Sequence, residues 1–86
     1  MTAHRAGLSV RQTRILRAIA TVNELEQRPA TIADLFAIDG APTADVVRAV
    51  WALRSRFLVR VEGPRVSSLQ RGRDLLASSY YRERGL

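Results

Sequence analysis

Arginine is the residue type with the most potential for chemistry in this chain of 86 residues. All 14 basic side chains are arginine, and they accompany eight carboxylates, one histidine and no cysteine. Five arginines balance five carboxylates up to Val47, whereas nine arginines face only three carboxylates from Arg48 onward. Because a guanidinium forms paired hydrogen bonds with phosphate and guanine, this basic half favours a polyanionic partner, most simply nucleic acid. A codon bias toward arginine in a protein with a solvated surface would give the same composition.

No set of residues in the sequence is suited to catalysis or to binding a metal or cofactor. His4 lies in an N-terminal arm, where it cannot act as the base of a nucleophilic triad. The five glycines are too far apart for a phosphate-binding loop, and the carboxylates form no pair with acid–base or metal-ligand spacing. We therefore expect a protein that is not an enzyme and has no cofactor or metal.

The sequence also lacks the features of an exported or membrane protein. It has no cysteine for disulfides, no apolar signal segment after Met1, and no apolar run of the roughly 20 residues that a bilayer-spanning helix needs. We expect a cytoplasmic protein with no membrane partner.

The candidate contact groups gather in one stretch, Thr43–Phe57, whose spacing predicts a helix with two distinct faces. One stripe is apolar and is expected to face the core: Val46, Val50, Leu53 and Phe57. The opposite side carries Ala44, Arg48, Trp51 and Ser55, with Val47 and Arg54 on its flank. A solvated helix surface is normally highly charged, so this mixture of arginine, tryptophan and small residues indicates a contact surface.

Two earlier helices are expected to support this one. Ser9 and Gln12 predict a capping box for a helix Val10–Glu26, whose core face contains Ile15, Leu16, Ile19, Val22 and Leu25. Pro29 ends that region, and Thr31 is the expected N-cap of a short helix, Ile32–Ile38. Gly40 supplies the left-handed residue of the turn that follows, so the pair matches helix-turn-helix spacing.

After Phe57 the pattern changes from helical to alternating. Leu58–Glu62 and Arg65–Ser67 predict a β-hairpin around Gly63–Pro64, and residues 29–31 offer a third short strand. Ser67 and Gln70 predict a capping box for a last helix, residues 68–84. The expected fold class is therefore mainly α with a small β-hairpin (α+β), in the order helix, helix, helix, strand, strand, helix. Residues 1–8 are expected to form a flexible arm and residues 9–86 a single domain.

From about Ser9 to Ala77 the chain resembles a winged helix-turn-helix domain of the kind found in MarR-like bacterial transcription regulators. Two stretches carry the resemblance: TIADLFAIDGAPTADVVRAVWALRSRFLVRVEG and SLQRGRDLL. The second is similar to the L-T-x-x-G-R-x-L-L segment that begins the helix after the wing. Gly72, Arg73, Leu75 and Leu76 match this segment, but its Leu-Thr is displaced, so Ser67 or Ser68 must cap the helix instead. The wing is also short, which argues against deep insertion into a minor groove.

The resemblance implies double-stranded DNA as the partner and assigns roles to individual residues. Thr43, Ala44, Val47 and Arg48 would lie at the major groove, with Arg48 placed to bind guanine O6 and N7. Arg65 at the hairpin tip would contact the backbone or the minor groove. Arg54, Arg60 and Arg73 would bind phosphates.

The function expected from these features is sequence-specific DNA binding by a small bacterial or phage transcriptional regulator or repressor. Helix 43–57 would occupy the major groove, and hairpin 58–67 would contact the DNA backbone. The protein would form a homodimer through the last helix, which carries Leu75, Tyr80 and Tyr81. Two alternatives remain open. One is an excisionase-like architectural factor, and the other is a protein-interaction winged helix whose partner binds Val47 and Trp51.

Overall fold

The computed structural model describes residues 7–40 and 42–83, without the side chains of residues 38, 39 and 79–83. Within this part of the chain the elements are α1 (Val10–Glu26), β1 (Ala30–Thr31), α2 (Ile32–Asp39), α3 (Thr43–Ser55), β2 (Val59–Glu62), β3 (Arg65–Ser68) and α4 (Gln70–Glu83). The predicted order is confirmed, and β1 is the third strand expected near Pro29. Residues 1–6 of the expected arm lie outside the described residues.

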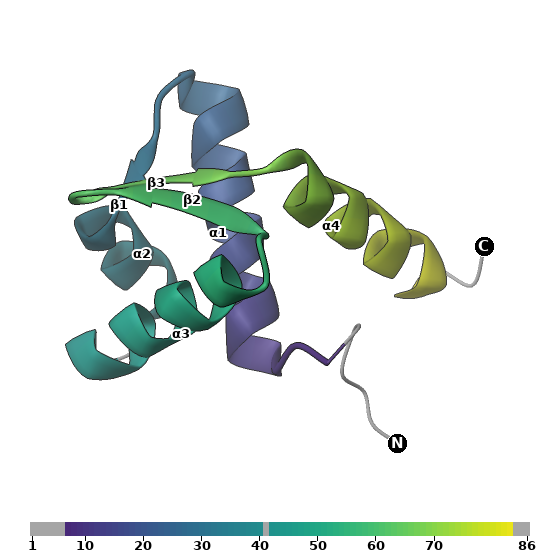
Figure 1. Ribbon diagram of the computed structural model, residues 1–86, viewed down its shortest axis with the longest axis horizontal. Coiled ribbons are helices and arrows are strands. Elements are labelled where there is room, and N and C mark those ends of the chain that lie inside the picture. The colour runs from purple at the N-terminus through teal and green to yellow at the C-terminus, as the bar shows by residue number, and fades with distance from the viewer. Residues whose placement is uncertain (1–6, 41, 84–86) are drawn as a thin grey trace.

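Helix α1 is the central support of the molecule, and both α2 and α3 pack against it (Figure 1). The predicted capping box is confirmed, because the Ser9 hydroxyl accepts from the Gln12 N–H and the Gln12 side chain accepts from the Ser9 N–H, each at 3.0 Å. The predicted core residues are buried except for Leu25, which is 75% exposed. The prediction for Leu25 is therefore wrong, and Figure 1 shows that the last turns of α1 extend past the sheet.

The three strands form an antiparallel sheet in the order β1-β3-β2. Val61 and Ala30 both pair with Val66 from opposite sides. Ala30 and Val66 are buried, and Val61 is partly buried against the core. The alternate positions Arg60, Glu62 and Arg65 are exposed. Gly63 has a φ of +60°, as the first central residue of a type II′ turn requires, and Pro64 follows it. The predicted hairpin is confirmed.

The connection between α2 and α3 follows from local sequence signals. Thr31 is the N-cap of α2, and its hydroxyl accepts from the Asp34 N–H at 3.3 Å. Gly40 ends α2 with a φ of +68°, and its N–H donates to the Phe36 carbonyl at 2.9 Å. Pro42 is the N-cap of α3. Both the predicted cap and the predicted turn are confirmed.

Helix α3 ends earlier than the sequence pattern predicts, and Phe57 is not part of its buried stripe. Phe57 has a φ of +62° and is 71% exposed. The N–H of Phe57 donates to the Arg54 carbonyl and that of Leu58 to the Leu53 carbonyl, at 2.9 and 3.1 Å, which is the Schellman pattern. Because this turn reverses the chain, Leu58 enters the core in place of Phe57, at 2% exposure.

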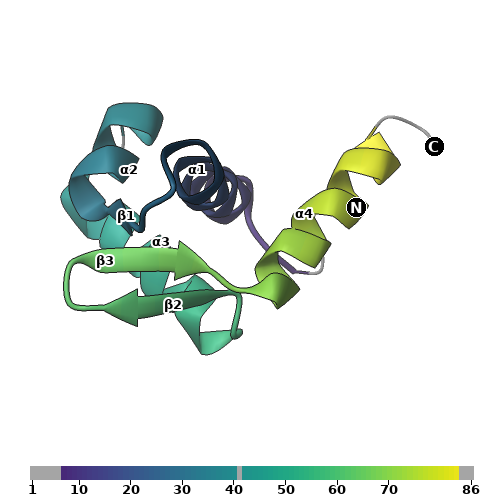
Figure 2. The same cartoon turned by 90° about the horizontal axis from the view of Figure 1, so that it is seen from above.

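Helix α4 begins at Gln70, and the predicted cap by Ser67 and Gln70 is wrong. Both candidate capping serines belong to β3, and the Ser68 hydroxyl donates to the Asn23 side chain at 3.1 Å. In the first turn of α4, the N–H groups of Gly72 and Arg73 donate to the Leu69 carbonyl. The rest of α4 projects away from the other helices (Figure 2).

The core lies between α1, α2, α3 and the inner face of the sheet. Its most enclosed side chains are Leu8, Ile15, Leu16, Ile19, Leu35, Val46, Leu53 and Val66. Among the described helices, none combines the length and the apolar character that a membrane crossing would require.

Candidate nucleic-acid interface

The two faces of α3 are separated as the sequence predicts. Val46, Val50 and Leu53 are buried, together with Ala49. The opposite face is exposed at Thr43, Ala44, Arg48, Trp51, Arg54 and Ser55, and Val47 is half-buried beside them. The Arg48 side chain is 77% exposed, so its guanidinium is accessible to a large partner.

A carboxylate lies between two arginines at the beginning of α3. Asp45 accepts from Arg11 Nη1 at 3.0 Å through Oδ2 and from Arg48 Nη1 at 3.2 Å through Oδ1. Arg11 belongs to the first turn of α1, so this cluster joins the two helices. The side chains of Arg11 and Arg48 also line a shallow surface hollow with Gln12 and Ala52.

The second half of the exposed face is dominated by Trp51 and Arg54. Trp51 is 50% exposed, and the Arg54 guanidinium lies 5.0 Å from the centre of its ring. A cation at this distance above an aromatic face is attracted by the ring quadrupole. The structure thus places Arg54 next to Trp51, where the pair forms one exposed surface that is both apolar and cationic.

The hairpin contributes a second group of arginines. Arg60 and Arg65 project from the outer face of the sheet, and Arg60 donates to Glu62 at 2.6 Å. The hairpin turn and the N-terminal end of α3 lie toward the same end of the molecule in both views (Figures 1 and 2). The elements that carry Thr43, Arg48 and Arg65 are therefore arranged so that one extended partner can contact them together.

Arg73 belongs to a different part of the structure. Its Nη1 donates to the Ser68 carbonyl at 2.7 Å, and its Nη2 donates to the Gln70 side chain at 3.0 Å. Together with Asn23 and Leu76 it lines a hollow of about 470 Å³ between α1 and α4. The Arg73 guanidinium thus joins the end of β3 to the start of α4, away from the arginines of α3.

The candidate partner residues on α4 are only partly described. Leu75 is half-buried and shares a hollow with Leu58 and Arg71. The side chains of Tyr80 and Tyr81 lie outside the described residues.

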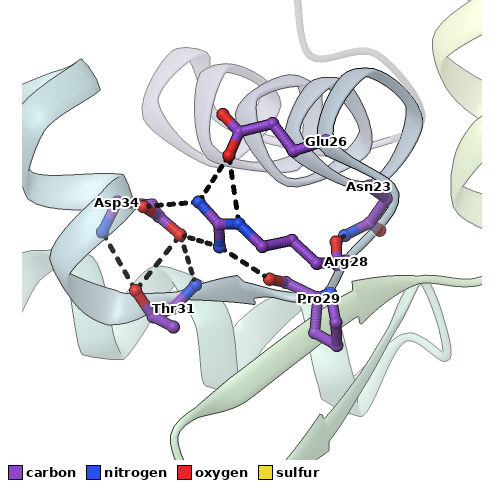
Figure 3. A network of polar contacts seen from close by, with 6 residues as sticks. All are labelled: Asn23, Glu26, Arg28, Pro29, Thr31 and Asp34. Carbon is purple, nitrogen blue, oxygen red and sulfur yellow. Dashed lines mark hydrogen bonds and ion pairs between the residues drawn. The ribbon is translucent and has the colours of Figure 1, made fainter.

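A polar network that the sequence pattern does not predict surrounds Arg28 (Figure 3). Arg28 donates to Asp34 at 2.9 Å and to Glu26 at 2.7 Å, and Asp34 also accepts from the Thr31 N–H at 2.9 Å. The hydrogen bonds from Arg28 and Thr31 lower the pKa of Asp34 to about 2, and those to Asp34 and Glu26 raise the pKa of Arg28. The one sequence feature that could have indicated this network is the position of Arg28 shortly before the Thr31 cap. Its contacts fix the loop between α1 and α2.

No protein-family model and no curated protein sequence matches the chain. The solved structure of Bordetella bronchiseptica BpsR, a protein whose DNA binding is regulated by 6-hydroxynicotinic acid, is similar in fold, with a TM-score of 0.73. The similarity covers 87% of this chain and 54% of that chain, at 20% sequence identity. The fold is a winged helix-turn-helix. In this winged helix, α2 and α3 form the helix-turn-helix and β2–β3 the wing, and the chain spans about half the length of BpsR.

Proposed function

We propose that this winged helix binds double-stranded DNA sequence-specifically and acts in transcription regulation. The observation that carries the proposal is the exposed face of α3, where Arg48 is 77% exposed and close to the N-terminal end of the helix. The N-terminal part of a recognition helix is the part that reaches base edges in the major groove of other helix-turn-helix proteins. The shared fold with BpsR, itself a DNA-binding protein, supports the same use here.

Residues of α3 and of the wing are assigned roles in DNA binding by their chemistry. Arg48 binds guanine O6 and N7, and Thr43, Ala44 and Val47 lie along the groove beside it. Arg60 and Arg65 of the wing, with Arg54 at the end of α3, bind phosphates and set the register on the duplex.

The finer assignment is a small bacterial or phage repressor that works in the cytoplasm as a homodimer. Helix α4 is the proposed dimer element, since it projects from the winged helix and carries Leu75, Tyr80 and Tyr81. A dimer would place two recognition helices on half-sites about one helical turn apart and so raise affinity and specificity.

The proposal is tested by titrating the protein with random-sequence duplex at two salt concentrations, followed by selection of the preferred sequence. Binding through phosphates weakens steeply as salt rises, because counterions are released from the DNA. We expect salt-sensitive binding and enrichment of a defined site that contains guanine. Absence of binding at low salt, despite a net charge of +6, would refute DNA as the partner.

A second candidate function is supported by Trp51 and Val47. Tryptophan is over-represented among residues that dominate protein–protein binding energy, and Trp51 is 50% exposed on the centre of α3. A partner protein bound there would be released by Trp51→Ala and would be little affected by salt. If Trp51→Ala leaves DNA binding intact and abolishes capture of a protein, the interaction role is supported. An excisionase-like architectural factor would instead bend the DNA, which a circular-permutation gel assay detects.

A further inference from the structure

Asp45 is a carboxylate that pairs with the proposed base-reading arginine, and it is the third residue of α3. Its side chain is 35% exposed, compared with 77% for Arg48. Its backbone N–H donates to the Pro42 carbonyl at 3.0 Å, and its Oδ2 accepts from Arg11 at 3.0 Å. Asp45 is therefore fixed from two directions, by the start of its own helix and by α1. Arg48 is more exposed than Asp45, and it pairs with a carboxylate whose own position is restricted.

The contact between Asp45 and Arg48 leaves the reading edge of the guanidinium open. It uses Nη1 of Arg48, at 3.2 Å from Oδ1. A planar guanidinium can still present its Nε and Nη2 edge to two acceptors when Nη1 is occupied. Guanine offers two such acceptors, O6 and N7, in the major groove. The ion pair is thus compatible with base readout and restricts the directions that Arg48 can take.

We propose that Asp45 is a positioning residue that increases the sequence specificity of the DNA contact made by Arg48. This inference rests on the proposed DNA-binding function. Asp45 acts in two ways, since it orients Arg48 toward a base edge and places a negative charge where a phosphate would otherwise approach. Specificity is a difference between two affinities, and the first effect strengthens binding to the correct site while the second weakens binding to others.

The wing supplies a matched control for the loss of charge. Glu62 is also an exposed carboxylate paired with an arginine, since it accepts from Arg60 at 2.6 Å. Asp45→Asn and Glu62→Gln each remove one negative charge beside arginine and keep the shape of the side chain. Asp45 pairs with both Arg11 and Arg48, and Glu62 pairs with Arg60. Both variants should raise affinity for random-sequence DNA, because each removes a carboxylate that competes with phosphate for arginine. Only Asp45→Asn should reduce discrimination between bases.

The experiment is a double-mutant cycle on base discrimination. The parent, Asp45→Asn, Arg48→Ala, the double variant and Glu62→Gln are titrated with the selected duplex and with the same duplex carrying adenine in place of the critical guanine. We expect Asp45→Asn to lower the ratio of the two affinities by about 2- to 5-fold, the range of an exposed ion pair. It should have no further effect on this ratio in the Arg48→Ala background, and Asp45→Glu should restore part of it.

The possible outcomes separate this inference from the proposed function. Equal loss of discrimination from Asp45→Asn with and without Arg48 would show a general structural effect and overturn the inference. A parent-like ratio in Asp45→Asn, or the same loss in Glu62→Gln, would overturn it as well, although DNA binding would stand. A parent that binds no duplex would refute the proposed function itself. A parent that binds without base preference would refute sequence-specific binding, and with it the positioning role.

Discussion

Gly72 is the residue at which α4 contacts the turn after α3. A Cβ at this position would lie 2.4 Å from the Leu58 carbonyl oxygen, which is backbone and cannot rotate away. Alanine is normally better than glycine inside a helix by about 1 kcal/mol, but here the clash reverses the sign. We expect Gly72→Ala to lower the free energy of unfolding by about 1–3 kcal/mol, as overpacking typically does.

Urea unfolding followed by circular dichroism measures this change. Ser78→Ala, at an exposed position on the same helix, is the control and should alter stability by less than about 0.5 kcal/mol. A Gly72→Ala protein more stable than the parent would contradict the close packing of α4 on Leu58.

Asn23 is the residue that links β3 to α1. Its Oδ1 accepts from the Ser68 N–H at 2.7 Å and from the Ser68 hydroxyl at 3.1 Å, and its Nδ2 donates to the Arg28 carbonyl at 3.0 Å. Ser68 is 6% exposed, so its polar groups have little access to water. Asn23→Ala should cost about 1–3 kcal/mol of stability, the penalty for buried polar groups left unpaired. Thr21→Ala, whose exposed hydroxyl donates only within α1, should have a small effect in the same unfolding assay.

At the scale of elements, the end of α3 carries backbone strain. Phe57 has a φ of +62°, a conformation that side chains other than glycine adopt at a cost, and its exposed ring has few contacts that would offset this cost. Phe57→Ala and Phe57→Gly both remove the ring. The difference between their stabilities therefore measures the cost of the left-handed backbone conformation for a residue with a side chain. We expect the glycine variant to be more stable than the alanine variant by about 1 kcal/mol in thermal unfolding. Equal stability would argue against a left-handed residue at this turn.

The start of α2 has a stability contribution that depends on pH. The pKa of Asp34 is lowered from its ordinary 3.8 to about 2, mainly by the hydrogen bond from Arg28 and secondarily by that from Thr31. The folded state therefore favours the charged carboxylate more than the unfolded state does. The contribution is complete above about pH 4 and is lost as the pH falls toward 2.

Asp34→Asn lacks this titration. The difference in unfolding free energy between the parent and Asp34→Asn should therefore be largest above pH 4 and should shrink toward pH 2 in acid-dependent urea melts. A difference that stays constant over this range would contradict the ion pair with Arg28.

The features that the sequence predicts correctly are those decided by a few neighbouring residues. The capping pairs at Ser9 and Thr31 and the turn at Gly40 are of this kind, as is the exposed face of α3. The predicted burial of Leu25 and Phe57 and the predicted Ser67–Gln70 cap are wrong, because each depends on where a distant element lies. The contacts of Arg28 and Arg73 were not predicted for a related reason. The sequence does not indicate which of many arginines meets a carboxylate or a carbonyl.

At the scale of the whole molecule, two groups of arginines can be distinguished among the described residues. Arg28 and Arg73 join elements within the winged helix, whereas Arg48, Arg54, Arg60 and Arg65 are exposed on α3 and the wing. Four of the nine arginines from Arg48 onward are thus presented by the two elements that a DNA duplex would contact. This distribution favours a polyanion as the partner and gives Arg48 the central position.

The most direct test is the affinity of Arg48→Ala for the selected DNA site, compared with that of Arg71→Ala. Arg71 is exposed on the first turn of α4, so both variants lose one positive charge and only one loses the proposed base contact. We expect Arg48→Ala to cost about 1–3 kcal/mol of specific binding and to relax the preference for guanine, while Arg71→Ala weakens all sequences slightly and equally. Equal affinities of Arg48→Ala and the parent for the selected site would contradict the placement of α3 in the major groove.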